Sequence, residues 1–395
     1  MSSPSLPSAK FVPLSEPVIA GNEWAYVKEC LDTGWVSSVG AFVDRFEKAT
    51  ADYAGAAHAV AVVNGTAAIH VGLLVAGVEP GDEVIVSDLT FAAPANAIRY
   101  ASAFPVFMDA RPDTWQMDAA KLERFLTSEC DRTASGCINR RSGRRVKAIV
   151  PVHILGLACE IDRIVALAGD YGLAVIEDAT EAVGVRYQGK HLGTFGDVGT
   201  FSFNGNKVIT TGGGGMVVTN DAALAARVRY LTTQAKDDPI EYVHHAIGYN
   251  YRLTNVLAAI GVAQLEQLGG FIARKRDIAA RYDAAIAGAA GLTPMPRQSG
   301  VVTNHWLYTT LLRPGTSLES RKAVVKQMNA LGIGVRPLWH TIHDLPPFAD
   351  CQAFEIEHSV ALYHRAMSLP SGAGLSDDDV SRTIAALGDV VSGLR

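Results

Sequence analysis

The sequence has little that would suggest a metal centre, a disulfide framework, a nucleic-acid surface or a membrane span. Its 395 residues include only five cysteines, none of them in a CxxC pair. Such scattered thiols predict reduced cysteines, a cytoplasmic protein and no metal. A net charge of −5 offers no basic field to nucleic acid or an anionic membrane. The N-terminus lacks the apolar stretch of a secretory signal, and we find no run of about 18 apolar residues.

Alternating strand-like and helical stretches make up the first half of the chain. Apolar runs at 59–64, 83–88, 105–110, 146–153 and 173–179 read as short strands, with helical stretches between some of them at 65–77, 95–103 and 160–172. This alternation predicts the α/β class, with a parallel sheet covered by helices. Two helical segments, 254–268 and 271–288, follow later in the chain.

The pattern also predicts three regions along the chain. Residues 1–10 are polar and rich in Ser and Pro, which predicts disorder. Residues 11–270 are expected to form a large α/β domain. Beyond about residue 290 strand, helix and strand patterns are shorter, so residues 271–395 are expected to form a smaller α+β domain.

Lys207 lies in a Gly- and Asn-rich loop between strand-like runs at 201–203 and 216–218. Most lysines are solvated surface charges, but one held among apolar neighbours can lose its charge and act as a nucleophilic amine. The four glycines at 212–215 form neither a Walker A loop nor a dinucleotide fingerprint, because a strand rather than a helix follows them.

The run VIEDATEA, residues 175–182, reads as a strand that ends in two carboxylates. The carboxyl ends of strands are where α/β sheets bind ligands. Such a carboxylate could be a metal ligand, a general base, a helix cap or a charge partner. Its position upstream of Lys207 favours a charge partner, and Asp178 is suited to hold the proton on the pyridine nitrogen of pyridoxal phosphate (PLP).

Gly65 and Thr66 follow a strand-like run and begin a helix. Free N–H groups at a helix N-terminus bind phosphate, although Thr66 could equally be an ordinary helix cap.

Five motifs, in this order, resemble the DegT/StrS-type PLP-dependent sugar aminotransferases. They are NGTAA, TFAAPANAI, VIEDATEA, FSFNGNK and GYNYRLTNVLAAIGVAQLEQL. The resemblance covers roughly residues 11–395 and implies a fold-type I aminotransferase with a large, mostly parallel sheet and a smaller C-terminal domain. Segments 34–40 and 231–255 are especially similar to the branch of the bacillosamine and legionaminic-acid pathways.

The resemblance also implies roles for individual residues. Lys207 would hold PLP through an imine and shuttle a proton, while Asp178 pairs with the pyridinium and Glu181 lies near the ring hydroxyl. Phe91 would stack on the ring. The phosphate would be held by Gly65, Thr66, Ser202 and, from the neighbouring subunit of a homodimer, Asn250.

The expected reaction moves the amino group of L-glutamate to C4 of a nucleotide-linked 4-keto-6-deoxy-N-acetylhexosamine, for a surface glycan. UDP is favoured over GDP or dTDP as the nucleotide. Sugar-nucleotide contacts are assigned to Trp35, Lys236, His245, Trp306 and Arg336, each of which also has an ordinary structural explanation. His153 follows a strand and is either a site residue or a structural one.

The sequence disfavours three other functions. A PLP sugar dehydratase of the same fold replaces the lysine with histidine, but residue 207 is Lys. A non-catalytic PLP protein would be expected to have lost Lys207 or Asp178. A nicotinamide-dependent enzyme would need a GxGxxG after its first strand, which is missing.

Overall fold

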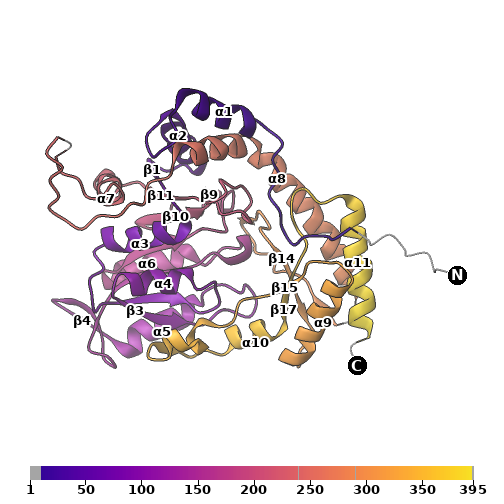
Figure 1. The fold of residues 1–395 in the computed structure, drawn as a ribbon. Helices are drawn as coiled ribbons and strands as arrows, with labels where there is room; N and C mark the ends of the chain where they lie inside the picture. Colours follow the sequence, from indigo (N-terminus) through magenta and orange to yellow (C-terminus); the bar gives the residue numbers. More distant parts are fainter. Residues whose placement is uncertain (1–9, 239, 290, 394–395) are drawn as a thin grey trace.

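The computed structural model describes residues 10–238, 240–289 and 291–393. The predicted disordered segment 1–10 therefore lies almost wholly outside the described residues. The main sheet has ten strands (Figure 1). Its strand order is β1 (His58–Val62), β11 (Gly215–Thr219), β10 (Val198–Ser202), β7 (Ala174–Asp178), β6 (Arg145–Val150), β2 (Glu83–Ser87), β3 (Phe104–Met108) and β16 (Gln352–Phe354), with the hairpin β4 (Cys130–Thr133) and β5 (Gly136–Asn139) attached to β6.

The direction of the strands confirms the α/β prediction. All neighbouring pairs from β10 to β16 are parallel, and only β11 runs antiparallel to its neighbours β1 and β10 within this path. Strands β2, β10 and β11 are buried at every position, which explains their continuous apolar runs. The helices of this part are α1 (Glu23–Thr33), α2 (Ala41–Ala54), α3 (Gly65–Val75), α4 (Ala93–Tyr100), α5 (Ala119–Glu129), α6 (Ile161–Tyr171) and α7 (Ala222–Thr232).

A second, four-stranded antiparallel sheet lies on the right in Figure 1. Its order is β12 (Leu292–Thr293), β14 (Tyr308–Leu312), β17 (Ala366–Leu369) and β15 (Arg336–Pro337), and its helices are α9 (Leu318–Ala330), α10 (His358–Arg365) and α11 (Asp377–Ser392). One strand from the C-terminal part of the chain enters the main sheet, and three further short strands form a third sheet. Strand β16 joins the main sheet beside β3, and β13 (Val301–Val302) pairs with β8 (Arg186–Tyr187), which also pairs with β9 (Lys190–His191).

The prediction of two separate helices after residue 253 is wrong. One continuous helix, α8 (Asn255–Ala287), runs through the glycine pair at 269–270. The cost of each glycine, about 1 kcal/mol, is offset because α1 and α2 pack on the helix, as does α11. By length and apolar composition α8 could cross a membrane, which the sequence analysis had not noticed, but these contacts are those of a core helix. The proposed domain boundary at residue 270 falls inside it.

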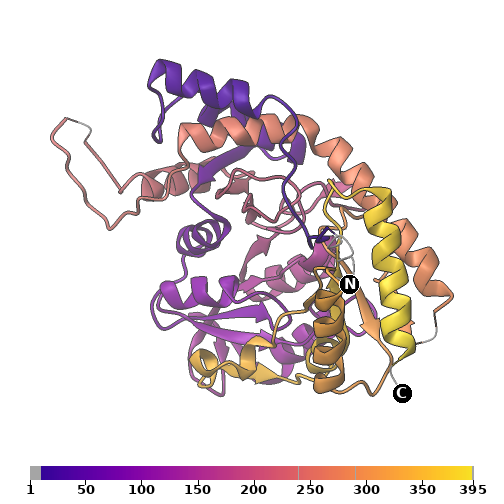
Figure 2. The same cartoon turned by 45° about the vertical axis from the view of Figure 1, so that its right-hand side comes forward.

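The segment between α7 and α8, described at residues 233–238 and 240–254, projects from the body of the molecule (Figures 1 and 2). We call it segment 233–254. Large apolar side chains on it, including Ile240, Tyr242 and Ile247, are exposed in the single chain. A soluble chain rarely leaves such side chains together on a projecting segment unless another surface covers them.

Candidate active site

A cavity of about 360 Å³ lies where β7 and β10 of the main sheet end. Parallel topology places the carboxyl ends of neighbouring strands at one edge, which is why motifs far apart in the sequence meet here. Its walls include the predicted residues Lys207, Asp178, Glu181, Gly65, Thr66, Ser202, Phe91 and Trp306.

Lys207 lies in the loop that follows β10, where its backbone N–H donates to the carbonyl of Asn204 at 3.0 Å. The side chain is only 13% exposed. Its Nζ lies 3.5 Å from Glu181 Oε1 and 4.1 Å from the centre of the Trp306 ring. An amine confined in this way, with an aromatic face on one side and an acid on the other, is suited to react with a carbonyl group.

Glu181 is the acid that faces this amine. Its Oε2 accepts the backbone N–H of Leu155 at 2.7 Å, which leaves Oε1 directed at Lys207. Leu155 is buried and has a φ of 61°, in the left-handed region that a branched residue rarely adopts. Burial raises the pKa of Glu181 to about 7, against the opposing effects of Lys207 and the Leu155 N–H. The carboxyl group can therefore hold or release a proton near neutral pH.

Asp178 is the last residue of β7 and is almost completely buried. Thr180 donates its backbone N–H to Oδ1 at 3.1 Å. Burial raises the pKa of Asp178 above its usual range, and this effect exceeds the opposing ones from Thr180 and Lys207. A buried carboxyl in this condition is stabilised by a cation placed against it in the cavity, such as a protonated ring nitrogen.

The N-terminus of α3 forms another wall of the cavity. Asn64 caps this helix, since its side chain accepts the N–H of Ala67 at 2.8 Å, so Thr66 is not the capping residue. The N–H groups of Gly65 and Thr66 form no hydrogen bond with the described residues. A Cβ at Gly65 would lie 2.9 Å from Ser202 Cβ, so the close approach of these two segments requires glycine. The arrangement suits a phosphate group.

The cavity therefore has the parts that PLP needs. An amine can hold the aldehyde, a buried acid can face the ring nitrogen, and helix N–H groups with a nearby hydroxyl can hold the phosphate. Phe91, on the loop before α4, lines the cavity and is 59% exposed, so its ring is free to cover a bound one.

Several cavity residues were missed or left unassigned by the sequence analysis. Trp339 lines the cavity and stacks on Trp306, with ring centres 6.3 Å apart and an interplanar angle of 10°. Asn64, Thr90, Thr180, Asn204 and Asn206 also line it. Most of these are next to predicted residues in the sequence, so their position beside a predicted residue could have identified them. Trp339 follows the predicted Arg336 by three residues at a predicted strand end, but the sequence analysis assigned it no role.

Other predicted residues lie away from the cavity in the single chain. Asn250, Lys236 and His245 are on the projecting segment 233–254, where Lys236 lies over the Tyr242 ring and His245 bonds to Asp237. Trp35 and Arg336 are exposed at other places on the surface. Their assigned contacts stay predictions, and those of the projecting segment depend on a second subunit.

The geometry favours the structural explanation for His153. Its Nδ1 accepts the N–H of Cys159 at 3.2 Å, and its Nε2 lies 3.1 Å from Glu177 Oε2. The ring is fully buried, and among the described residues it does not line the cavity. It therefore supports the strand that carries Asp178 from behind.

Fold and cavity together define a PLP-dependent aminotransferase, and comparison with known proteins places it in a family. The profile of the DegT/DnrJ/EryC1/StrS aminotransferase family matches residues 17–388. The chain belongs to this family and is a nucleotide-sugar transaminase that uses PLP. The predicted family, fold class, cofactor and enzyme class are thereby confirmed.

Similar proteins include GDP-perosamine synthases. That of Caulobacter vibrioides is 43% identical over 96% of this chain and 98% of its own length. That of Escherichia coli O157:H7 is 40% identical over 94% of this chain and 96% of its own length. Among solved structures, the aminotransferase TlmJ from Streptoalloteichus hindustanus has a TM-score of 0.88 and 28% identity, with 97% and 99% of the two chains covered.

Proposed function

We propose that this enzyme transfers the amino group of L-glutamate to C4 of a GDP-linked 4-keto-6-deoxyhexose, in amino-sugar biosynthesis for a surface glycan. The observation that carries the transamination is one cavity in which Lys207 faces Glu181 and Asp178 lies at the end of β7. The choice of GDP is supported by relatives 43%, 40% and 38% identical that are named GDP-perosamine synthase.

PLP, when bound, supplies a ring that accepts electrons from the carbon losing its proton. Lys207 would remove that proton and return it, because its amine is free once the amine of glutamate has displaced it. Asp178 would face the ring nitrogen and hold the proton on it. Glu181, whose pKa lies near 7, accepts or donates a proton beside the amine, and the paired rings of Trp306 and Trp339 keep water from this side of the cavity.

A UDP-linked 4-keto-6-deoxy-N-acetylhexosamine is the second candidate. It is favoured by the similarity of segments 34–40 and 231–255 to the branch that acts on such sugars. Helicobacter pylori PseC, an aminotransferase of pseudoaminic acid biosynthesis, is also a structural neighbour, with a TM-score of 0.88 and 25% identity.

One experiment separates these candidates. The purified enzyme with PLP and glutamate is incubated in parallel with GDP-, UDP- and dTDP-linked 4-keto-6-deoxysugars, and amine formation is followed by mass spectrometry. The proposal expects the highest kcat/KM with the GDP-linked sugar and no product from Lys207→Ala. A higher kcat/KM with the UDP-linked N-acetylhexosamine would reverse the choice of substrate. No amine from any of the three sugars would refute the proposed function.

We also propose a homodimer that shares its active sites. Asn250 lies at the base of the projecting segment, where it forms a β-bridge with Thr233, and among the described residues it does not line its own chain's cavity. We propose that it reaches the cavity of a second subunit instead. The exposed apolar side chains of that segment would be covered by the same contact. We further propose that the enzyme is cytoplasmic. We also propose that residues 11–270 form the large domain and residues 271–395 the small one, with α8 running through both.

A further inference from the structure

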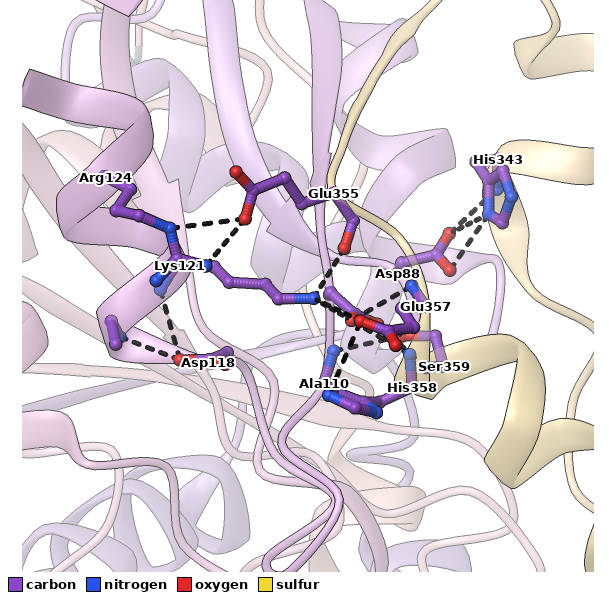
Figure 3. Close-up of polar contacts among 12 residues, drawn as sticks. Asp88, Ala110, Asp118, Lys121, Arg124, His343, Glu355, Glu357, His358 and Ser359 are labelled. Carbon is purple, nitrogen blue, oxygen red and sulfur yellow. Dashed lines mark hydrogen bonds and ion pairs between the residues drawn. The ribbon is translucent and has the colours of Figure 1, made fainter. Parts of the chain in front are cut away.

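Two carboxylates outside the active site attach the C-terminal part of the chain to the main sheet (Figure 3). Asp88 directly follows β2 and Asp109 directly follows β3, and both side chains are fully buried, at 0% exposure. Both bind segment 339–359, which we name the strap. The strap leaves β15, adds β16 to the edge of the main sheet and returns through α10.

The Asp109 attachment has a fixed charge balance. Its carboxylate accepts backbone N–H groups of Glu357, His358 and Ser359 at 2.8 to 3.1 Å, at the start of α10. Lys121 Nζ lies 2.6 Å from the same carboxylate. Although burial opposes the charged form, Lys121 and these donors lower the pKa of Asp109. This end of the strap is therefore held over the whole working pH range.

The Asp88 attachment depends on a histidine. Nδ1 of His343 lies 2.9 and 3.0 Å from the two carboxylate oxygens, and the backbone N–H of the same residue donates to Oδ1 at 2.9 Å. Nε2 lies 3.3 Å from Asp344, which is in the same 3-10 turn, η2 (Ile342–Asp344). With a proton on both nitrogens, the ring can bond to Asp88 and to Asp344 at once.

This pair joins two walls of the cofactor cavity. Asp88 is followed within three residues by Thr90 and Phe91, which line the cavity from the loop before α4. His343 follows Trp339 on the strap, and Trp339 lines the cavity from the opposite part of the chain. A change in the contact between Asp88 and His343 therefore changes how the two walls are held together.

We propose that Asp88 and His343 are a positioning pair that holds the Phe91 wall against the Trp339 wall, so that the cavity binds PLP and sugar nucleotide most tightly when His343 is protonated. Neither residue touches the reacting atoms. The proposal rests on the proposed placement of PLP in this cavity.

The charges around His343 set the direction of the pH dependence. Carboxylates face the ring from β2 (Asp88), from β3 (Asp109, already paired with Lys121) and from its own turn (Asp344). The hydrogen bond to Asp88 is the main reason that the pKa of His343 is raised, and burial opposes it. Because the pKa of His343 in the folded protein lies above the usual value of about 6.5, the ring is charged at pH values below about 6.5, and its contact with Asp88 is then strongest. It weakens as the pH rises through the folded pKa.

The test measures PLP dissociation constants of the cofactor-free protein between about pH 6 and about pH 9. For each variant, the PLP dissociation constant is divided by that of the wild type at the same pH. Groups that titrate in both proteins affect both constants equally, so their effect cancels in this ratio. His343→Gln keeps an N–H donor but cannot be charged. Its ratio should exceed one at the acid end and approach one at the alkaline end. His343→Leu should weaken PLP binding roughly tenfold at the acid end.

The matched control is His358→Gln. His358 lies on the same strap, and the one ion pair that its ring forms with the described residues is a 3.9 Å contact with the exposed Glu357. The PLP dissociation constant of His358→Gln divided by that of the wild type should stay at one across the pH range. Two results would overturn the proposal. One is a His343→Gln dissociation constant equal to that of the wild type at every pH, and the other is a ratio for His358→Gln that changes with pH in the same way as that for His343→Gln. If His343→Leu does not fold, His343→Gln still decides the question.

Kinetics give a second readout that a merely structural effect would not produce. With the loaded enzyme, His343→Gln should raise KM for the nucleotide sugar and leave kcat near the wild-type value. A fall in kcat with KM unchanged would contradict a positioning role. A wild-type protein that forms no lysine-bound PLP would instead refute the proposed function, whatever the His343 variants show.

Discussion

The cofactor cavity and the projecting segment 233–254 differ in how their residues are held. Asp178 and Glu181 are buried at or just after the end of β7, Lys207 is largely buried in the loop after β10, and all three are held by contacts within the chain. Lys236 and His245 are on an exposed segment and contact mainly their own neighbours. The difference is that the residues proposed to move the proton lie together in one chain. Contacts with the sugar nucleotide from the projecting segment would require a second one.

Lys207→Ala should have the largest effect, the loss of all measurable transamination, because no other lysine among the described residues lines the cavity. The variant should also lose the absorbance of lysine-bound PLP at roughly 410–430 nm. Its circular dichroism should match the wild type, since the side chain is near the surface of the cavity. Normal turnover by this variant would remove the lysine from the mechanism.

Asp178→Asn should lower kcat on the order of a hundredfold or more, because the amide cannot stabilise a charged ring nitrogen. Single-turnover rates with glutamate measure this step apart from product release. A matched variant, Glu177→Gln, alters a carboxylate on the same strand that bonds to His153 behind the cavity. If Asp178→Asn turns over as fast as the wild type, some other acid faces the ring.

Glu181→Gln should change stability in a pH-dependent way. The folded pKa of about 7 lies above the unfolded value. As the pH rises between these two values, the free energy of unfolding of the wild type therefore falls, because its buried Glu181 must lose a proton. The Glu181→Gln variant has no such loss. The gain in unfolding free energy of the cofactor-free variant should grow by on the order of 2–3 kcal/mol from about pH 5 to about pH 8. Urea titrations at both pH values measure this, and an equal gain at both would contradict the assignment.

Gly65→Ala should weaken PLP binding by roughly tenfold, since a Cβ there would crowd Ser202 and shift the phosphate-binding N–H groups. Titration of the cofactor-free protein with PLP measures the constant. Gly269→Ala is the control, because a Cβ at that position meets no atom within 4 Å. Equal PLP affinity in both variants would show that this helix start does not hold the phosphate.

Mixing protomers tests the projecting segment itself. Lys207→Ala and Asn250→Ala should each be inactive or weak alone. If sites are shared, random pairing should restore about a quarter of wild-type activity, because half of the dimers contain one intact site of two. Activity that stays at the level of the separate variants would mean that Asn250 does not act across an interface.

The same difference decides what could be predicted from the sequence. Lys207, Asp178 and Gly65 follow or precede buried strands, and parallel topology brings such positions together, so local patterns were enough. Trp339 reaches the cavity from the start of the strap, just after β15, which pairs with β17 of the second sheet. Asp88 and Asp109 hold the strap further along, and a local sequence pattern cannot reveal such long-range contacts. The continuous helix α8 was missed for a related reason, since tertiary packing overrides the glycine pair.

The central claim is that the amine of Lys207 holds the cofactor. Borohydride reduction of the PLP-loaded enzyme, followed by proteolysis and mass spectrometry, tests it most directly. The prediction is a single phosphopyridoxyl group on the peptide that contains Lys207, and none after prior incubation with glutamate. A group found on another lysine, such as the buried Lys275, with the Lys207 peptide unmodified, would contradict it.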